Sequence, residues 1–248
     1  MKVLGVIPAR YESTRFPGKP LVDIQGKSMI ARVYERCSSA SSLDQVIVAT
    51  DDPRIYDHVS SFGGEVMMTS ERHRSGTDRC AEVAAKHSDA GIVVNIQGDE
   101  PFIDPAQIDQ LVQLFDGPSG VDIATLAKKI DSEKALLDPN IVKVVFNSEA
   151  QALYFSRSTI PFVRNLASSQ WLRHHDFYKH IGIYAFRNEV LQTCAELPQG
   201  RLEVMESLEQ LRWLEAGYSI KVGLTVLETI GIDTPEDLEK FETKNEFL

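Results

Sequence analysis

A short apolar run at residues 3–7 ends at Pro8 and is followed at once by a basic, hydroxyl-bearing loop. A continuous apolar run of this length is typical of a strand buried on both faces, as in a parallel sheet covered by helices. Open sheets of this kind bind ligands at the carboxyl ends of their strands. The start of the chain therefore predicts an α/β protein with a ligand site just after its first strand.

The loop after this strand gathers positive charge in one turn-rich segment. Pro17-Gly18 predicts a bend that can bring Lys19 back over the end of the strand. Charge-assisted donors and exposed backbone N–H groups at such a place suit the oxygens of a triphosphate. The predicted phosphate-binding residues of the loop are Arg10, Ser13, Arg15 and Lys19.

The alternative for this segment is a solvated basic loop. The chain contains 36 Asp and Glu residues against 26 Lys and Arg, so cations that gather beside Glu12 alone are unexpected in so acidic a protein. This contrast favours the phosphate site. The loop matches neither the P-loop pattern nor Gly-x-Gly-x-x-Gly, so the expected mode of phosphate binding is a different one.

Composition limits the other classes of function. A chain of 248 residues with a hydrophobic fraction of 43% can form one α/β domain or two small ones. The net charge of −10 argues against a general nucleic-acid or membrane surface. No apolar run has the length of a membrane span and no signal peptide precedes the first strand, so we expect a cytoplasmic protein. The widely spaced Cys37, Cys80 and Cys194 are expected to be reduced thiols.

A predicted strand at residues 91–97 delivers Gly98 and Asp99 to the ligand edge of the sheet. Mg²⁺ needs only one or two protein carboxylates, because phosphate oxygens and water complete its coordination shell. The alternative is an ordinary turn Asp before Pro101, but a glycine directly at the end of a buried strand favours the metal. Asp99 is therefore the predicted ligand of Mg²⁺, which is the predicted cofactor.

Ser75 and Asp78 have the spacing of a capping box at the start of a helix that runs to His87. Capping accounts for these two residues, but it does not account for Arg74 and Arg79. Both arginines flank a first helical turn that presents free N–H groups. This segment is therefore a second candidate for contact with an anionic ligand.

Apolar runs and helical spacing alternate along the first part of the chain, which predicts a parallel sheet covered by helices. Strand-like segments at residues 121–126, 142–146 and 151–155 then follow without long helices between them. This spacing predicts a sheet that becomes mixed or antiparallel. A strand is expected at residues 180–187, and one continuous helix at residues 203–214.

The segment VIPARYESTRFPGKPL at residues 6–21 resembles the N-terminal signature of the sugar-activating cytidylyltransferases, most closely the CMP-Kdo synthetase (3-deoxy-manno-octulosonate cytidylyltransferase) family. Further segments resemble that family in the same order along the chain. They are SGTDR, QGDEP, YFSR, HIGIY, LEQLR and GIDTPEDL. The resemblance spans nearly the full length and leaves residues 162–179 without a match.

The resemblance implies a Rossmann-like nucleotidyltransferase fold within the α/β class: a mixed, mostly parallel sheet flanked by helices, with an antiparallel extension. It implies a single domain over residues 1–248. The nucleotide-binding part is expected at about residues 1–116, and the part for sugar binding and dimerisation at about residues 117–230. A homodimer is the expected assembly.

The resemblance also implies roles for individual residues. Nucleotide contacts are expected from Pro8, Ala9, Arg10, Ser13, Arg15, Lys19, Arg74, Ser75, Gly76, Arg79 and Asp99. Sugar contacts are expected from Gln97, Arg157, His180, Tyr184 and Glu209, and Asp233 is expected to be a second Mg²⁺ ligand. The residues expected to act in catalysis are Arg10, Arg15, Lys19, Asp99 and Asp233.

Several of these residues have a simpler structural alternative. Arg157 could form a surface salt bridge, and His180 could be an ordinary strand histidine. Glu209 could lie on a solvated helix face, and Asp233 could be a turn residue before the Thr234-Pro235 helix start. The matching segments favour the functional interpretation in each case.

The expected reaction joins CTP to the acidic sugar 3-deoxy-D-manno-octulosonate (Kdo), giving CMP-Kdo and pyrophosphate for lipopolysaccharide biosynthesis. No covalent enzyme nucleophile is expected, so catalysis would rest on position and charge. One alternative is a related enzyme for another acidic sugar, such as 8-amino-Kdo or sialic acid. The other is a catalytically silent nucleotide-sensing domain, against which the presence of both Asp99 and Asp233 argues.

Overall fold

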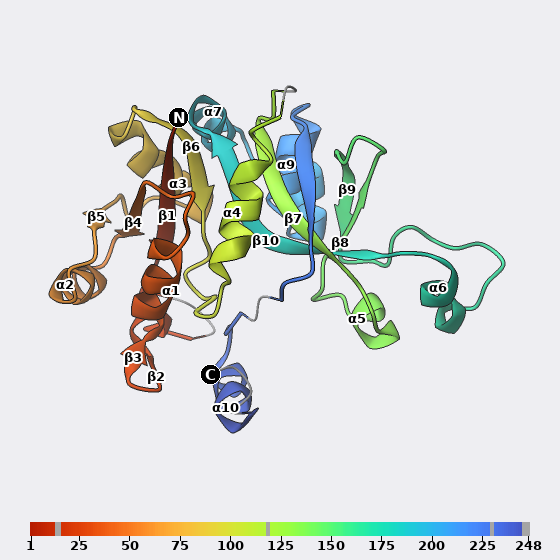
Figure 1. Cartoon of the computed structure of the whole chain (residues 1–248), viewed down its shortest axis with the longest axis horizontal. Coiled ribbons are helices and arrows are strands. Elements are labelled where there is room, and N and C mark those ends of the chain that lie inside the picture. Colours follow the sequence, from red (N-terminus) through yellow and green to blue (C-terminus); the bar gives the residue numbers. More distant parts are fainter. Residues whose placement is uncertain (13–15, 118–119, 229–230, 245–248) are drawn as a thin grey trace. The chain divides into compact units, whose positions relative to one another are not determined.

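The computed structural model describes residues 1–12, 16–117, 120–228 and 231–244. The chain forms two compact units (Figure 1). The first unit comprises Met1–Asp109 together with Glu228–Leu248, and the second comprises Gln110–Leu227. None of the helices in these described ranges has the length and apolar character that a membrane crossing requires.

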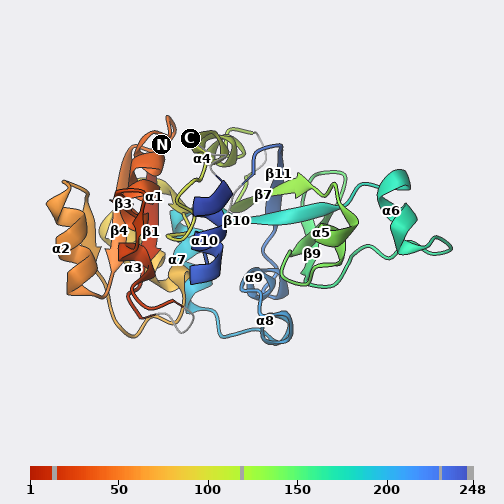
Figure 2. The same cartoon turned by 90° about the horizontal axis from the view of Figure 1, so that it is seen from below.

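The first unit is built on a parallel sheet with the strand order β6-β1-β4-β5. Its strands are β1 (Lys2–Ala9), β4 (Gln45–Thr50), β5 (Val66–Met68) and β6 (Ala90–Asn95). The helices between them are α1 (Met29–Ser38), α2 (Pro53–Ser61) and α3 (Gly76–Lys86), with α1 and α3 on opposite sides of the sheet (Figure 2). Helices on both sides explain why the strands are apolar on both faces.

Each of these helices begins at a residue whose side chain caps it. Ser28 accepts a hydrogen bond from the Ala31 N–H, and Asp52 accepts one from the Arg54 N–H. Ser75 and Asp78 form the predicted capping box. A cap of this kind stabilises a helix by about 1 kcal/mol, so polar residues after the strands fix where each helix starts.

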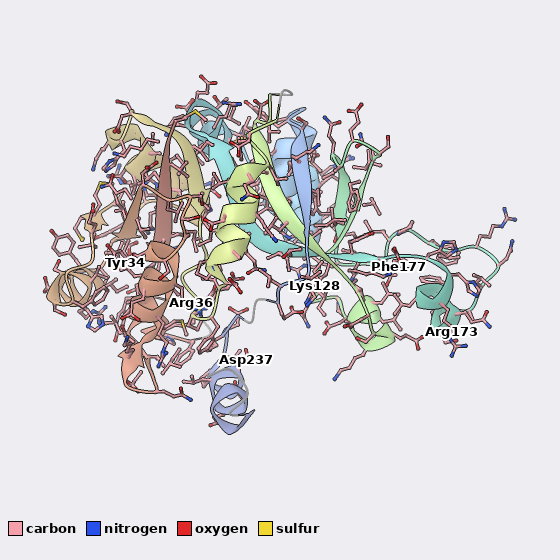
Figure 3. The ribbon with its side chains drawn as sticks, in the orientation of Figure 1. Tyr34, Arg36, Lys128, Arg173, Phe177 and Asp237 are labelled. Carbon is pink, nitrogen blue, oxygen red and sulfur yellow. The ribbon has the colours of Figure 1, made fainter. Side chains whose placement is uncertain are left out.

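The last part of the chain returns to the first unit. Ile232 is buried in a cluster with Ile24 and Met29, against which Phe102 and Leu238 also pack. Ile24 belongs to a small hairpin of β2 (Asp23–Ile24) and β3 (Lys27–Ser28), which follows the 3-10 helix η1 (Lys19–Leu21). The terminal helix α10 (Pro235–Lys244) follows directly, and Asp237 in its first turn accepts hydrogen bonds from Thr234 (Figure 3).

The second unit has a mixed sheet, as the closely spaced strand segments predict. β11 (Ile220–Thr225) pairs parallel with β7 (Ile123–Lys129), which pairs antiparallel with β10 (Tyr178–Arg187). β8 (Lys143–Phe146) pairs antiparallel with both β10 and β9 (Ala152–Ser156). The helices are α5 (Glu133–Leu137), α6 (Ser168–His174), α7 (Asn188–Glu196), α8 (Arg201–Glu206) and α9 (Gln210–Glu215), while α4 (Pro105–Gln113) contains the division between the units. The predicted α/β class with an antiparallel extension is confirmed.

Residues 162–179, which match no family segment, contribute to a small apolar cluster of the second unit. Trp171 on α6 and Phe177 are buried against Ile130 and Leu136, and the two aromatic rings stack with centroids 5.9 Å apart. The exposed Arg173 lies in the last turn of α6 (Figure 3). Through Trp171, this cluster packs α6 against the rest of the second unit.

The expectation of one helix over residues 203–214 is wrong. α8 ends at Glu206, and Ser207 adopts a left-handed conformation with φ of 53° before α9 begins at Gln210. The buried Glu203 carboxylate accepts hydrogen bonds from Gly200 N–H at 3.0 Å and from the Arg212 guanidinium at 2.9 and 2.7 Å. This ion pair joins the two short helices across the break.

Candidate active site

Lys19, Asp99 and Asp233 come together in the first unit from three distant parts of the chain. The Lys19 ammonium lies 2.7 Å from Asp99 Oδ2 and 3.2 Å from Asp233 Oδ1. Asp99 follows β6, Lys19 opens η1, and Asp233 precedes α10. The Ile232 N–H donates to the Asp99 carbonyl at 2.9 Å, which holds the two aspartate segments side by side. The fold therefore builds a cluster with one cation and two carboxylates.

Two glycines allow the strand ends to approach each other at this cluster. A Cβ on Gly98 would lie 2.8 Å from the Pro8 carbonyl oxygen, closer than a carbon can normally come. A Cβ on Gly76 would lie 3.1 Å from Pro8 Cγ. Pro8 at the end of β1 is thus packed between the turn that carries Asp99 and the first turn of α3. Glycine is required at residue 98, where the neighbouring atom belongs to the backbone, and residue 76 leaves little room for a side chain.

The cluster has a strongly negative environment. Burial, together with the charges of Asp99 and Asp233, raises the pKa of Glu100 to about 8. Glu100 Oε2 is buried without a hydrogen-bond partner among the described residues. Three neighbouring carboxyl groups in a partly buried place favour the binding of a cation.

Mg²⁺ fits this donor set. The two aspartates already share one cation, the Lys19 ammonium, so their oxygens converge on a common point. Within the described ranges, no group of three or more His, Cys, Asp or Glu residues is arranged to hold a metal. Mg²⁺ does not need such a group, because it keeps water and phosphate oxygens in its shell. Asp99 and Asp233 are the residues that could hold it.

In the folded protein the basic loop is paired with carboxylates from other segments of the chain. Lys19 pairs with Asp99 and Asp233, and Arg10 Nε lies 3.8 Å from Asp51 Oδ2. The neutralising groups come from other segments, which the local sequence does not reveal. Arg10 remains about half exposed, while Ser13 and Arg15 lie outside the described residues.

The segment at the start of α3 divides into exposed and buried residues. Arg74 is exposed, and its backbone N–H donates to Asp78 Oδ2 at 3.0 Å. Ser75 uses its hydroxyl in the capping box, and Gly76 is the first residue of α3. Arg79 is fully buried and donates to Thr69 Oγ1 and, at 2.6 Å, to Asp51 Oδ2. The geometry therefore assigns Arg79 to the support of neighbouring strand ends.

Arg157, in the second unit, is held by backbone carbonyl groups. Its Nε donates to the Glu206 carbonyl at 2.8 Å, and its terminal nitrogens donate to the carbonyls of Pro139 at 3.2 Å and Ser207 at 3.4 Å. The Arg157 backbone N–H also donates to Glu206 Oε2 at 2.9 Å. The guanidinium is thus fixed in place at the end of β9, and it has five N–H donors of which some are left for a ligand.

His180 and Tyr184 are neighbours on β10, which covers the strand predicted at residues 180–187. Their ring centroids are 5.2 Å apart, and the His180 ring hydrogen-bonds the Thr125 hydroxyl at 3.0 Å. Burial lowers the pKa of His180 to about 3, so the ring is neutral at ordinary pH. Burial also raises the pKa of Tyr184 well above its usual value, with a further contribution from Glu209. Both residues therefore act as neutral polar groups.

Sequence reasoning missed two residues of α9, Gln210 and Trp213. In the part of the chain that the structure describes, Tyr184 OH, Gln210 Nε2 and Trp213 Nε1 are buried without a hydrogen-bond partner. The rings of Tyr184 and Trp213 meet edge to face at 5.0 Å. Unpaired buried polar atoms are costly, so this group is suited to a polar ligand. The signal that could have found them is their place one and four residues after Glu209 in the sequence.

The remaining two predicted sugar residues lie at element ends. Glu209 is directly before α9, and its carboxylate accepts from Arg212 at 3.4 Å. Gln97 lies just after β6 in the first unit, and its carbonyl accepts from the Glu100 N–H at 3.4 Å. Both positions are partly exposed. Arg157, His180, Tyr184 and Glu209 all belong to the second unit, whereas Gln97 belongs to the first.

The chain is similar to known proteins over nearly its whole length. The family model described as cytidylyltransferase matches residues 4–230. A 3-deoxy-manno-octulosonate cytidylyltransferase of Parabacteroides distasonis is 57% identical, over 97% of this chain and 96% of its own. An 8-amino-3,8-dideoxy-manno-octulosonate cytidylyltransferase of Shewanella pealeana is 51% identical, over 98% of each chain. A solved CMP:2-keto-3-deoxy-manno-octonic acid synthetase complexed with CTP has a TM-score of 0.90 and 46% identity, over 98% of each chain.

The match is thus nearly end to end, at an identity far above that of proteins that share a fold alone. It includes the segments that carry Lys19 and Asp99. The chain belongs to the cytidylyltransferase family.

Proposed function

We propose that the protein transfers CMP from CTP to the anomeric hydroxyl of Kdo and releases pyrophosphate. The observation that carries this proposal is the meeting of Lys19, Asp99 and Asp233 at the strand ends of the first unit. The Lys19 ammonium can bind phosphate oxygens, and the two carboxylates can bind a metal ion. This combination suits a nucleoside triphosphate that binds together with a metal ion. The similarity to 3-deoxy-manno-octulosonate cytidylyltransferases supports the choice of sugar.

The nucleotide is assigned to the first unit. Arg10, Arg15 and Lys19 neutralise the β- and γ-phosphates as pyrophosphate leaves, with Ser13 as a hydroxyl donor. The start of α3 at Gly76 suits an anion as well, because the first turn of a helix carries the positive end of its dipole. Ala9, Arg74 and Ser75 complete this set, and Arg79 supports it through Asp51.

Asp99 and Asp233 would hold the Mg²⁺. When bound, the ion would withdraw charge from the α-phosphate and lower the pKa of the attacking hydroxyl. The Lys19 ammonium contacts both carboxylates. When nucleotide binds, it can form ion pairs with phosphate oxygens in place of these carboxylates. No residue forms a covalent intermediate in this account, because the sugar hydroxyl attacks phosphorus directly in line.

Within the second unit, the sugar is assigned to Arg157, His180, Tyr184 and Glu209. The fixed guanidinium of Arg157 supplies positive charge for the sugar carboxylate. The unpaired buried polar atoms of Tyr184, Gln210 and Trp213 favour a ligand rich in hydroxyl groups. A second candidate sugar is 8-amino-Kdo, because a relative of nearly equal similarity is named for that substrate.

We also propose that the protein is a homodimer. The second unit exposes large apolar side chains, among them Phe162, Met205, Leu153 and Val204. Exposed apolar residues of this size suit a protein interface. Sedimentation equilibrium tests the proposal: a mass twice that of the chain is expected, and a monomer at all concentrations would contradict it.

The experiment for the reaction is pyrophosphate release. CTP, Kdo and Mg²⁺ are supplied together and then omitted one at a time, with 8-amino-Kdo and sialic acid as alternative sugars. We expect release only when nucleotide, sugar and Mg²⁺ are all present. A higher kcat/KM with 8-amino-Kdo than with Kdo would make 8-amino-Kdo the proposed substrate. CTP binding without release on any of these sugars would point to a nucleotide-sensing protein.

A further inference from the structure

Arg54, a residue outside every family segment, contacts the basic loop of the first unit. It lies in the first turn of α2, and its guanidinium forms two hydrogen bonds with the Asp52 carboxylate, at 2.9 and 2.6 Å. The guanidinium carbon lies 3.3 Å from the centroid of the Tyr11 ring. Asp52 also caps α2, so the Arg54 guanidinium is fixed by a rigid helix start.

Tyr11 in turn contacts the residue before Lys19. Its carbonyl accepts the Gly18 N–H at 2.8 Å, and its ring lies over Gly18 so closely that a Cβ there would be 3.2 Å from ring atoms. Gly18 has φ of 73°, a left-handed conformation that turns the chain into η1. Lys19 is the next residue and points its ammonium at Asp99 and Asp233.

A chain of direct contacts therefore runs from the start of α2 to the ammonium of Lys19. It passes through Asp52, Arg54, Tyr11 and Gly18. The bland alternative is a surface ion pair between Asp52 and Arg54, and such pairs contribute little when exposed. That alternative does not explain why the guanidinium is stacked on an aromatic ring that packs against the turn. A planar cation held by a carboxylate and stacked on a ring restrains both partners.

We propose that Arg54 is a positioning residue for nucleotide binding. By holding the Tyr11 ring over Gly18, it keeps Lys19 in the orientation that a triphosphate requires. The inference rests on the proposed function, because it assigns a task to the same phosphate site. It adds a residue from α2 that has no contact with the nucleotide in this role.

The test is the dissociation constant for CTP in the presence of Mg²⁺, measured by calorimetry on the full chain. We expect Arg54→Ala and Tyr11→Leu each to weaken CTP binding by about three- to tenfold, the size of one cation–π contact. Tyr11→Phe keeps the ring and should bind CTP as the unchanged protein does. Arg173→Ala, which removes an exposed guanidinium from α6, is the matched control and should have no effect.

The double variant gives the sharper readout. If the two residues act through one contact, Arg54→Ala with Tyr11→Leu should bind CTP no more weakly than either single variant. KM for CTP should rise in these variants while KM for the sugar stays unchanged, which a general loss of stability would not produce. Thermal unfolding checks that each variant is folded.

Three results would overturn the inference: an Arg54→Ala variant that binds CTP as tightly as the unchanged protein, losses that simply add in the double variant, or a Tyr11→Phe variant as weak as Tyr11→Leu. Failure of the unchanged protein to bind CTP would be a different outcome. It would remove the proposed function and this inference together.

Discussion

The two units hold their charged residues in different ways. In the first unit, Lys19 is paired with the side chains of Asp99 and Asp233, ionic partners that phosphate and a metal ion can replace. In the second unit, Arg157 is bound to three backbone carbonyls, whose positions are set by the fold of the chain. The first arrangement can reorganise when a charged ligand enters. The second is a preformed binding position that selects a ligand by its shape and its charge.

The largest effect is expected at the replaceable cluster. Asp99→Asn removes one carboxylate charge from the proposed metal site and should lower turnover by roughly a hundred- to a thousandfold or more, the scale of a lost electrostatic contact in catalysis. The side chain keeps its size, so the unfolding temperature should change little. Pyrophosphate release measures the effect, with Asp89→Asn, an exposed aspartate paired with Lys2, as control. Near-normal turnover would remove the metal assignment.

Lys19→Ala is expected to have the next largest effect. It removes the cation that is shared by Asp99 and Asp233, so CTP should bind more weakly and turnover should fall by roughly a hundredfold. Steady-state kinetics at varied CTP measures both quantities. Lys27→Ala removes an exposed lysine that pairs with Glu35 and is the matched control. Equal KM for CTP in the Lys19 variant and the unchanged protein would contradict a phosphate role.

Arg157→Ala tests the preformed binding position in the second unit. KM for the sugar should rise by roughly tenfold with little change in KM for CTP, because the lost charge faces the sugar in this account. Since the guanidinium also holds three carbonyls, stability should fall by about 1–3 kcal/mol. Kinetics and chemical denaturation separate the two losses, and Arg201→Ala serves as the exposed control. A loss of stability with unchanged sugar KM would make Arg157 purely structural.

The remaining expected effect concerns stability and its dependence on pH. Burial lowers the pKa of His180 to about 3 from an ordinary value of 6.5, so between these values the unfolded chain binds a proton that the folded protein does not. Stability should therefore fall as the pH is lowered through this window. His180→Gln removes that proton, and its free energy of unfolding should depend less on pH between 6.5 and 3. An unchanged pH dependence would show that His180 titrates normally in the folded protein.

Local features of this fold could be predicted well from the sequence. The strand before Pro8, the capping box at Ser75 and the helix start at Thr234-Pro235 all depend on neighbouring residues and are present in the structure. The closely spaced strands of the second unit likewise predicted its antiparallel pairs. The first strand, the capping box and the last helix start could be predicted because each is set by a few consecutive residues.

The contacts that complete the candidate site could not be predicted in this way. The partners of Lys19 are 80 and 214 residues away in sequence, and the carbonyls around Arg157 come from chain segments that only the fold brings together. The break at Ser207 is spanned by the ion pair of Glu203 and Arg212, which helical spacing alone does not reveal. Roles that the family resemblance suggested for Asp233 and Arg157 remain predictions for the experiments above.

The most direct test of the account is a crystal structure with CTP and Mn²⁺, using the anomalous signal of the metal to locate it. The account predicts one metal peak with carboxylate oxygens of both Asp99 and Asp233 at about 2.0–2.2 Å, and phosphate oxygens completing its shell. Lys19 should then have exchanged at least one of its carboxylate partners for a phosphate oxygen. A metal bound elsewhere, with Lys19 still joined to both aspartates, would contradict the central claim.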